Sequence, residues 1–363
     1  MRNRIRILSW LFVVLAFPPV KAADVYHAQG ELAGEPGVDS ALLQSRLTAV
    51  KSMDENRAVP GALGVARFVI DQGPGSADAM VTPWLTAESK SDYIVRYFLR
   101  GLQPNRRYRY HLEFGANETT TKKGPFRWFR TLPDPASHAR LSFLMFNCMS
   151  WDAFMDGYSN RLPYAGPDKA LGYPTLATMK RYSDSHFVIG AGDLVYYDVP
   201  SSSKATTLEE LRTKWRRQFS LPRAIDFFGT IGAYWMKDDH DFRYDDADLT
   251  GLRGPSPELG IRVFKEQMPV VPHEDFNRPT YRTVRASANV QLWFVEGRDY
   301  RSPKAMPDGP DKSIWGMKQR EWLKKTLRES NATWKLLITE ISHEGRGRRI
   351  PARGGRVGRK SQG

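Results

Sequence analysis

Cysteine is almost absent from this chain of 363 residues, which contains only Cys148. A single cysteine excludes an internal disulfide. Exported proteins normally use their cysteines in pairs, so Cys148 is a buried spectator, an intermolecular link or a functional thiolate. The residues that surround it in the fold decide among these three.

Long apolar runs are also missing. Residues 7–17 are mostly apolar, but they fall short of the ~20 residues that a membrane-spanning helix needs, and no later segment is long enough either. Arginines precede this run, and the small side chains of Val20 and Ala22 follow it. This order is typical of a secretory signal peptide. We therefore expect residues 1–22 to be removed after Ala22, no transmembrane segment, and a secreted or periplasmic protein.

An excess of acidic residues is absent too, since the net charge is +14. Much of this charge lies in residues 1–22 and 344–363, and the segment between them is only mildly basic. A few basic residues beside an anionic substrate would account for that remainder, so charge alone predicts no nucleic-acid binding. Residues 343–363 are rich in Arg and Gly without apolar periodicity, and we expect a disordered tail there.

The N-terminal part of the chain after the signal peptide reads as β-structure. We interpret residues 23–60 as an extended lead-in with a helix near residues 40–50. From residue 61 to residue 133, short runs rich in Val, Ile, Tyr and Phe alternate with turn residues, which is typical of strands. The strands are expected at residues 66–70, 92–99, 108–114 and 126–133.

A leucine, a proline and a tyrosine (Leu102, Pro104 and Tyr108) lead into the third of these strands. Their order resembles the tyrosine corner of immunoglobulin-like and fibronectin type III sandwiches, in which the ring packs into the core and the hydroxyl bonds to the preceding turn. An ordinary hairpin is the alternative. We predict an all-β fibronectin/immunoglobulin-like sandwich at residues 61–133, followed by a linker.

After residue 139 the pattern changes to buried strands that alternate with helices, which predicts an α/β layered domain at residues 139–342. The helix at residues 318–329 is the clearest, because Leu323 and Leu327 lie one turn apart. Strands are expected at residues 141–146, 187–191, 230–236, 291–295 and 334–341, and helices at 173–182, 208–219 and 318–329.

Reactive side chains directly follow four of these strands. Ligands bind at the carboxyl ends of strands in α/β sheets, so these side chains are expected to meet at one edge. Carboxylates and a phenolate suit hard cations such as iron, calcium or manganese, and a bound cation favours the thiolate. Gly192 allows a sharp turn after the second strand. The residues are Cys148; Asp193 and Tyr196; Asp238, Asp239, His240 and Asp241; and Glu296, Arg298, Asp299 and Arg301.

Each of these residues also has a simpler interpretation. Cys148 could be a buried small hydrophobe, Asp193 a turn residue and Tyr196 a core aromatic. His240 could lie in a solvated loop, although such a loop would not need to follow an apolar strand so closely. The arginines after the fourth strand could form structural ion pairs. The ordered set on successive strands favours a ligand site.

Two motifs in this set resemble a known family. The segment Gly192-Asp-Leu-Val-Tyr196 matches the GDxxY motif of purple-acid-phosphatase-like metallophosphoesterases, and Asp238-Asp-His-Asp241 resembles the DDH[DE] motif of the alkaline phosphatase D family. Cys148, the segment Gly297-Arg-Asp-Tyr-Arg301 and blocks between residues 316 and 335 are similar to further parts of that family. The resemblance implies a β-sandwich followed by an α/β metallophosphoesterase-type layered sandwich.

The resemblance also implies a metal centre. Cys148, Asp193 and Tyr196 would bind iron, and Asp193 would bridge to a second metal, calcium, with Asp239 as a further ligand. Manganese or zinc are possible instead.

A metal-dependent phosphoric ester hydrolase, an alkaline phosphatase or phosphodiesterase, is the activity that the resemblance implies. His240 would contact the phosphate and protonate the leaving group. Arg298 and Arg301 would hold phosphate oxygens by bidentate hydrogen bonds. The substrate would be a small-molecule or lipid phosphate ester.

The family's last metal-ligand motif, a GDxH-like pair, has no match in this sequence. We therefore expect the layered sandwich to be incomplete at its C-terminus, through truncation or a shifted reading frame near residue 340. Sequencing the gene downstream would test this, since a GDxH motif in another frame supports it. The alternative function is a catalytically impaired exported protein that binds phosphate ligands through a degenerate metal site.

Overall fold

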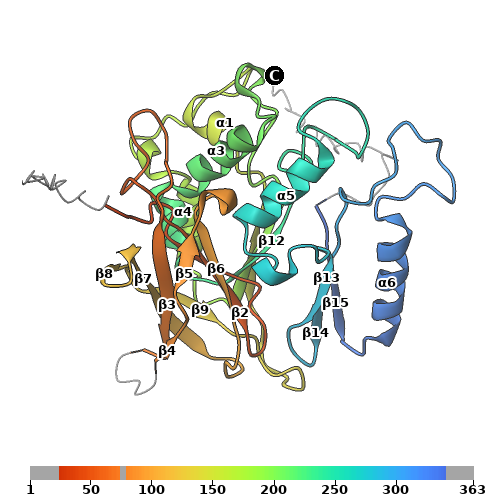
Figure 1. Cartoon of the computed structure of the whole chain (residues 1–363). Coiled ribbons are helices and arrows are strands. Elements are labelled where there is room, and N and C mark those ends of the chain that lie inside the picture. Colours follow the sequence, from red (N-terminus) through yellow and green to blue (C-terminus); the bar gives the residue numbers. More distant parts are fainter. Residues whose placement is uncertain (1–23, 74–78, 341–363) are drawn as a thin grey trace, which may run out of the picture.

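The computed structural model describes residues 24–73 and 79–340 (Figure 1). The predicted signal peptide at residues 1–22 and the predicted tail at residues 343–363 lie outside these ranges. Within the described residues, no helix combines the length and the apolar character that a bilayer crossing requires.

Six strands of the N-terminal half form one antiparallel sheet with β3 and β7 side by side. Side chains of β3 are alternately buried and half-buried, as expected for a strand with one face on a core. Phe68, Tyr110 and Leu112 on that face pack against Leu43 and Val95 of a second sheet. The strands are β3 (Gly64–Asp71), β4 (Met80–Val81), β5 (Leu85–Ala87), β7 (Arg107–Asn117), β8 (Thr120–Lys123) and β9 (Arg127–Arg130).

Tyr108 makes the contact expected of a tyrosine corner. Its ring is buried and stacks on Phe129, with 5.6 Å between the ring centroids. Its hydroxyl accepts a hydrogen bond of 2.8 Å from the backbone N–H of Gln103 in the preceding turn. Leu102 is buried in the same core. The tyrosine-corner prediction is therefore confirmed.

The second sheet takes strands from both halves of the chain, in the order β10-β11-β12-β1-β2-β6. Strand β1 pairs in parallel with β12 through Gly34 and Ala233, and antiparallel with β2. Residues 24–60 thus contribute two sheet strands, and the helix expected near residues 40–50 is wrong. The strands are β1 (Glu31–Gly34), β2 (Ala41–Arg46), β6 (Ile94–Leu99), β10 (Phe143–Phe146), β11 (Phe187–Ala191) and β12 (Ala233–Met236).

Strand β2 escaped recognition because all six of its side chains are buried. A short strand that is covered on both faces shows no alternation, so its periodicity does not separate it from a buried helix. The domain boundaries drawn at residues 61, 133 and 139 stay predictions, since one sheet joins strands from both sides of them.

A third sheet packs face to face with the C-terminal part of the second. Phe187, Ile189 and Tyr234 of the second sheet meet Leu292 and Phe294 of the third in one core. Helix α6 covers the outer face of the third sheet, on the side away from α3, α4 and α5 (Figure 1). The result is a layered α/β/β/α arrangement. The strands are β13 (Arg282–Arg285), β14 (Val290–Phe294) and β15 (Trp334–Ile338), with β14 and β15 parallel.

The helices begin where the local sequence favours a start. Thr207 and Glu210 form a capping box at α3, which begins and ends where the sequence predicts. Pro222 and Pro257 occupy the first turns of α4 and α5, two helices that the sequence analysis missed. The helices are α1 (Trp151–Met155), α2 (Pro174–Lys180), α3 (Leu208–Phe219), α4 (Pro222–Phe228), α5 (Pro257–Gln267) and α6 (Gly316–Glu329), with short 3-10 turns at Ser89–Ser91, Lys169–Leu171, Ser201–Ser203 and His273–Asp275.

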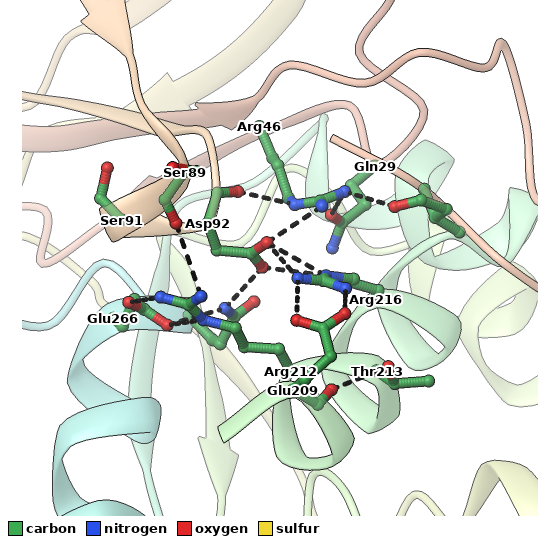
Figure 2. Close-up of polar contacts among 12 residues, drawn as sticks. Gln29, Arg46, Ser89, Ser91, Asp92, Glu209, Arg212, Thr213, Arg216 and Glu266 are labelled. Carbon is green, nitrogen blue, oxygen red and sulfur yellow. Dashed lines mark hydrogen bonds and ion pairs between the residues drawn. The ribbon is translucent and has the colours of Figure 1, made fainter. Parts of the chain in front are cut away.

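A buried ion network fastens α3 and α5 to the N-terminal strands (Figure 2). Asp92, in the turn before β6, is fully buried and lies between Arg46 of β2 and Arg216 of α3. Arg212 of α3 pairs with Glu266 of α5 at 2.6 Å. The network therefore fixes the N-terminal strands relative to the layer formed by α3 and α5.

Candidate active site

Three parallel strands bring the predicted residues to one edge of the second sheet. Strands β10, β11 and β12 pair in register, Phe146 with Gly190 and Ala191 with Met236. Beyond the strands, the backbone N–H of Met149 still bonds to the carbonyl of Asp193 at 2.8 Å. The side chains that follow these strands therefore converge on one edge.

The turn after β11 needs a glycine. Gly192 has φ of +91°, and a Cβ there would lie 2.8 Å from the backbone nitrogen of Asp238. Cys148 and Asp193 also adopt left-handed backbone conformations, with φ of 58° and 54°. Such conformations cost about 1–3 kcal/mol in residues with a side chain and cluster at functional sites. The local backbone is thus specialised at this edge.

Cys148, Asp193 and Tyr196 form a first group of donors. The Sγ atom of Cys148 lies 3.5 Å from Oδ2 of Asp193, and the Tyr196 hydroxyl donates to the same oxygen at 2.9 Å. Cys148 is exposed, so its interpretation as a buried hydrophobe is wrong. Burial raises the pKa of both Cys148 and Tyr196, and the neighbouring Asp193 carboxylate raises each pKa further. A bound cation would reverse these shifts.

Asp193, Asp239 and His240 form a second group, in which the ligand atoms all lie within 4.8 Å of one another. Both carboxylates are buried. Among the residues that the structure describes, the Oδ1 atom of Asp193 has no hydrogen-bond partner, and burial raises the pKa of this carboxyl. A buried carboxylate oxygen that lacks a hydrogen bond and lies beside a second carboxylate is energetically unfavourable. A cation bound between the two carboxylates would make the same arrangement favourable. This donor set therefore fits a metal.

His240 is held in a fixed orientation. Its Nδ1 lies 2.7 Å from Oδ1 of Asp198, and its ring stacks on Tyr196 with 4.2 Å between the ring centroids. Burial alone would lower the pKa of His240, but the bond to Asp198 and the nearby charges of Asp193 and Asp239 outweigh it and raise the pKa to about 9. The bond at Nδ1 leaves Nε2 as the atom free to meet a ligand.

Arg298 follows β14, which lies in the third sheet and not in the second as the prediction of a single edge implied, but its side chain reaches the same site and is paired within the protein. Its Nε and Nη2 donate to Oδ1 of Asp238 at 2.9 and 2.7 Å, and its Nη1 donates to the carbonyl of Ala247 at 3.0 Å. Burial raises the pKa of Asp238 to about 7, although Arg298 counteracts this shift. Arg301 pairs with Asp246 at 3.2 Å. The structure thus shows the ion pairs for both arginines, and their contacts with phosphate stay predictions.

Three acids near this edge have roles that the sequence analysis did not assign. Asp198 orients His240. Asp241 is fully buried and accepts from the backbone N–H groups of Leu194 and Asp238 at 2.9 and 2.6 Å, which ties the turns after β11 and β12 together. Asp246 donates its backbone N–H to Oδ2 of Asp239. Asp241 belongs to the DDH[DE] motif, whereas only the fold reveals the other two.

Two solved structures share this fold. A structure of PhoD matches with a TM-score of 0.68 at 19% sequence identity, covering 88% of this chain and 63% of that chain. A purple acid phosphatase isolated from yellow lupin (Lupinus luteus) seeds matches with a TM-score of 0.53 at 17% identity, over 85% of this chain and 50% of that chain. The chain therefore has the layered fold found in these phosphatases.

Sequence comparison then gives the family. The family model described as PhoD-like phosphatase matches residues 143–345, more than half of the chain. This chain belongs to the PhoD-like phosphatases, which confirms the resemblance noted in its motifs. Alkaline phosphatase D of Bacillus subtilis (strain 168) is 23% identical over 270 residues, which make up 66% of this chain and 43% of that protein. The chain thus spans less than half the length of this curated relative.

Proposed function

We propose that this chain is a metal-dependent phosphoesterase, an alkaline phosphatase or phosphodiesterase. The observation that carries the proposal is the position of Asp193. Its Oδ2 contacts Cys148 and Tyr196, and its ligand atom also lies within 4.8 Å of those of Asp239 and His240. A carboxylate that lies between Cys148 and Tyr196 on one side and Asp239 on the other suits a pair of cations, and His240 would contact the phosphate instead of a metal.

The two donor groups differ in chemistry, which bears on the choice of metals. A thiolate and a phenolate at Cys148 and Tyr196 suit iron, whereas the oxygen of Asp239 suits calcium. Manganese or zinc are alternatives at either position. Bound cations of this kind polarise a phosphoryl oxygen and lower the pKa of bound water, so that hydroxide is available at neutral pH.

His240 and Arg298 are the proposed catalytic side chains. Since Asp198 occupies Nδ1 of His240, Nε2 is the atom that would donate a proton to the leaving oxygen. Arg298 lies 3.8 Å from Oδ2 of Asp239 and would add positive charge beside the phosphate. Its pairing with Asp238 keeps the guanidinium in a fixed plane.

A small-molecule or lipid phosphate ester is the proposed substrate class, and a secreted or periplasmic location is proposed from the predicted signal peptide. Nucleic acid is not proposed as a partner, because the excess positive charge lies mainly near the chain ends.

Metal analysis of the purified chain, together with hydrolysis of a chromogenic phosphodiester, tests this proposal. The expected result is bound iron with turnover, both lost in Cys148→Ala. The exposed residue Thr121 on β8 supplies the control, since Thr121→Ala is expected to change neither. Metal without turnover would favour the alternative, an exported protein that binds phosphate ligands. A chain that binds no metal at all would contradict both.

A further inference from the structure

Beyond the residues assigned above, three cations converge on the carboxylate of Asp246. Arg301 Nη1 lies 3.2 Å and Arg298 Nη1 lies 3.7 Å from Oδ1 of Asp246, and the Lys304 ammonium bonds to the other oxygen. The Asp246 side chain is itself 38% exposed. Arg298 has Asp238 as its main partner, so the cations that share the Asp246 carboxylate as their partner are Arg301 and Lys304.

A pocket of about 360 Å³ opens beside this cluster, lined by residues of the loop that precedes α6. Arg301, Lys304 and Lys312 contribute cationic side chains to its wall, and Ser302 and Ser313 also line it. Asp308 also lines the pocket and pairs with Lys312 at 2.8 Å, so the cations of the wall outnumber its one carboxylate by two. The backbone N–H of Ser302 donates to the carbonyl of Ser313 at 2.8 Å, and the N–H of Ser313 donates to the Ser302 hydroxyl at 2.9 Å. The two sides of the loop are thus held together around a basic hollow.

The pocket is linked to the candidate metal centre through two short contacts. Arg298 lies 3.8 Å from Oδ2 of Asp239 and 3.7 Å from Oδ1 of Asp246. Asp246 in turn contacts Arg301 and Lys304, two residues that line the pocket. A substrate whose reacting phosphate lies beside Asp239 would therefore bring an adjoining part of itself towards this pocket.

We propose that Arg301, Lys304 and Lys312 form a second anion subsite, and that the Asp246 carboxylate binds Arg301 and Lys304 until substrate displaces it. The proposal rests on the proposed function and narrows its substrate class to phosphate esters that carry a second phosphate group. A phosphate offers more acceptor oxygens and more negative charge than one carboxylate, and arginine binds it in a bidentate manner. Asp246 then competes with the second phosphate of the substrate for Arg301 and Lys304.

Two non-hydrolysable probes test this subsite: propylphosphonate, with one anionic group, and 1,3-propanediylbisphosphonate, with two. The measured quantity is the ratio of their affinities for the purified chain by calorimetry. Because the bisphosphonate has two equivalent ends, it binds a single site about twice as tightly as the monophosphonate for statistical reasons alone. The subsite is expected to raise this affinity ratio to about tenfold or more. A ratio near two would overturn the proposal, as would failure to bind either probe.

Two variants are expected to move this ratio in opposite directions. Lys304→Gln removes a subsite cation and is expected to lower the affinity ratio towards two, whereas Asp246→Asn removes the competing carboxylate, keeps the backbone N–H that contacts Asp239, and raises the ratio several-fold. Lys324→Gln, an exposed residue of α6 paired with Glu321, makes the same charge change and leaves the ratio unaltered. If Asp246→Asn lowers the ratio in a chain with an unchanged unfolding midpoint, the displacement model is wrong.

The affinity ratio of the two probes can be measured whether or not the chain hydrolyses an ester. A chain that prefers the bisphosphonate but hydrolyses no ester would contradict the proposed function and leave the subsite standing. A chain that hydrolyses esters but has an affinity ratio near two would support the proposed function and contradict the subsite.

Discussion

Asp92 and Arg46 form an ion pair that is almost wholly removed from water where the N-terminal strands meet α3. Arg46 Nη2 lies 3.0 Å from Oδ1 of Asp92, and its Nε donates to the Asp92 carbonyl at 2.8 Å. Arg216 approaches the same carboxylate from the other side (Figure 2). One buried carboxylate thus serves two guanidinium groups from different parts of the chain.

Removal of this carboxylate is expected to be costly. Asp92→Asn keeps the side-chain shape but leaves the buried guanidinium of Arg46 without its counter-charge, while Arg216 retains only its pair with the exposed Glu209. Breaking a buried pair in this way typically costs about 3–5 kcal/mol. Urea denaturation measures the change in free energy of unfolding. Asp226→Asn, which removes an exposed partner of Lys180, is the matched control and is expected to change stability by less than about 1 kcal/mol. Equal effects of the two variants would refute this role for Asp92.

The ion pairs of Asp92 should also make the free energy of unfolding depend on pH in the acid range. Burial alone would raise the pKa of Asp92, but Arg46 and Arg216 outweigh it and lower the pKa below its ordinary value of 3.8. The stability that ionised Asp92 contributes is therefore fully present above pH 3.8 and lost as the pH falls through the lowered value. Other carboxyl groups titrate in this range, so the difference between the parent chain and Asp92→Asn isolates this contribution. The difference in free energy of unfolding should shrink below pH 3.8, and a constant difference would contradict the assignment.

Gly192→Ala tests the specialised turn after β11. A Cβ at this position would lie 2.7 Å from Cβ of Asp238, and the left-handed backbone adds strain. Gly101 has a similar φ of +77° with nothing within 4 Å of its Cβ position, so Gly101→Ala carries the strain without the collision. Thermal and urea unfolding should show about 1 kcal/mol lost in Gly101→Ala and more than about 3 kcal/mol in Gly192→Ala. Similar losses would mean that the turn has room to relax.

Arg243 organises the loop between Asp241 and α5. Arg243 is 1% exposed, and its guanidinium donates to backbone carbonyls of five residues of that loop. It has no carboxylate partner within residues 24–73 and 79–340. Arg243→Met should free these carbonyls and destabilise the chain by about 2–4 kcal/mol. Hydrogen exchange of residues 244–255 should accelerate while that of α6 stays unchanged. Arg253→Met, an exposed neighbour, is expected to leave both unchanged, and uniform acceleration would point to global destabilisation instead.

The sequence predicted elements whose ends or faces carry local signals. Helix α3 is recognisable because Thr207 and Glu210 cap it and Leu211, Trp215 and Phe219 form one apolar stripe. Strand β2 contains Gln44, Ser45 and Arg46, all buried, and such polar residues do not suggest a covered strand. Their partners lie far along the chain, as in the bond from Gln44 to the carbonyl of Gln267. Burial of this kind depends on tertiary structure and leaves no local periodicity.

In the candidate site, too, some residues could be predicted from local sequence and others depend on tertiary contacts. Cys148, Asp193, Tyr196, Asp239 and His240 were predicted because each closely follows an apolar strand, and strand ends meet at one edge of a sheet. Asp198 and Asp246 act through contacts between loops. Asp198 contacts His240, and Asp246 contacts Arg301 in the loop that precedes α6. No spacing rule relates these partners, so only the folded chain identifies them.

Asp198 is expected to act on catalysis through His240 alone. It lies 2.7 Å from Nδ1 of His240, so Asp198→Asn should allow the ring to turn or change tautomer and lower kcat about 10–100-fold with little change in KM. Asp245 lies 3.8 Å from the other ring nitrogen and its side chain is 82% exposed, so Asp245→Asn should change kcat by less than about threefold. Steady-state kinetics on a chromogenic phosphodiester, with metal content measured in parallel, separates the two effects. If Asp198→Asn loses metal along with activity, Asp198 supports the metal centre rather than the histidine; if neither variant changes kcat, His240 does not donate the proton in the rate-limiting step.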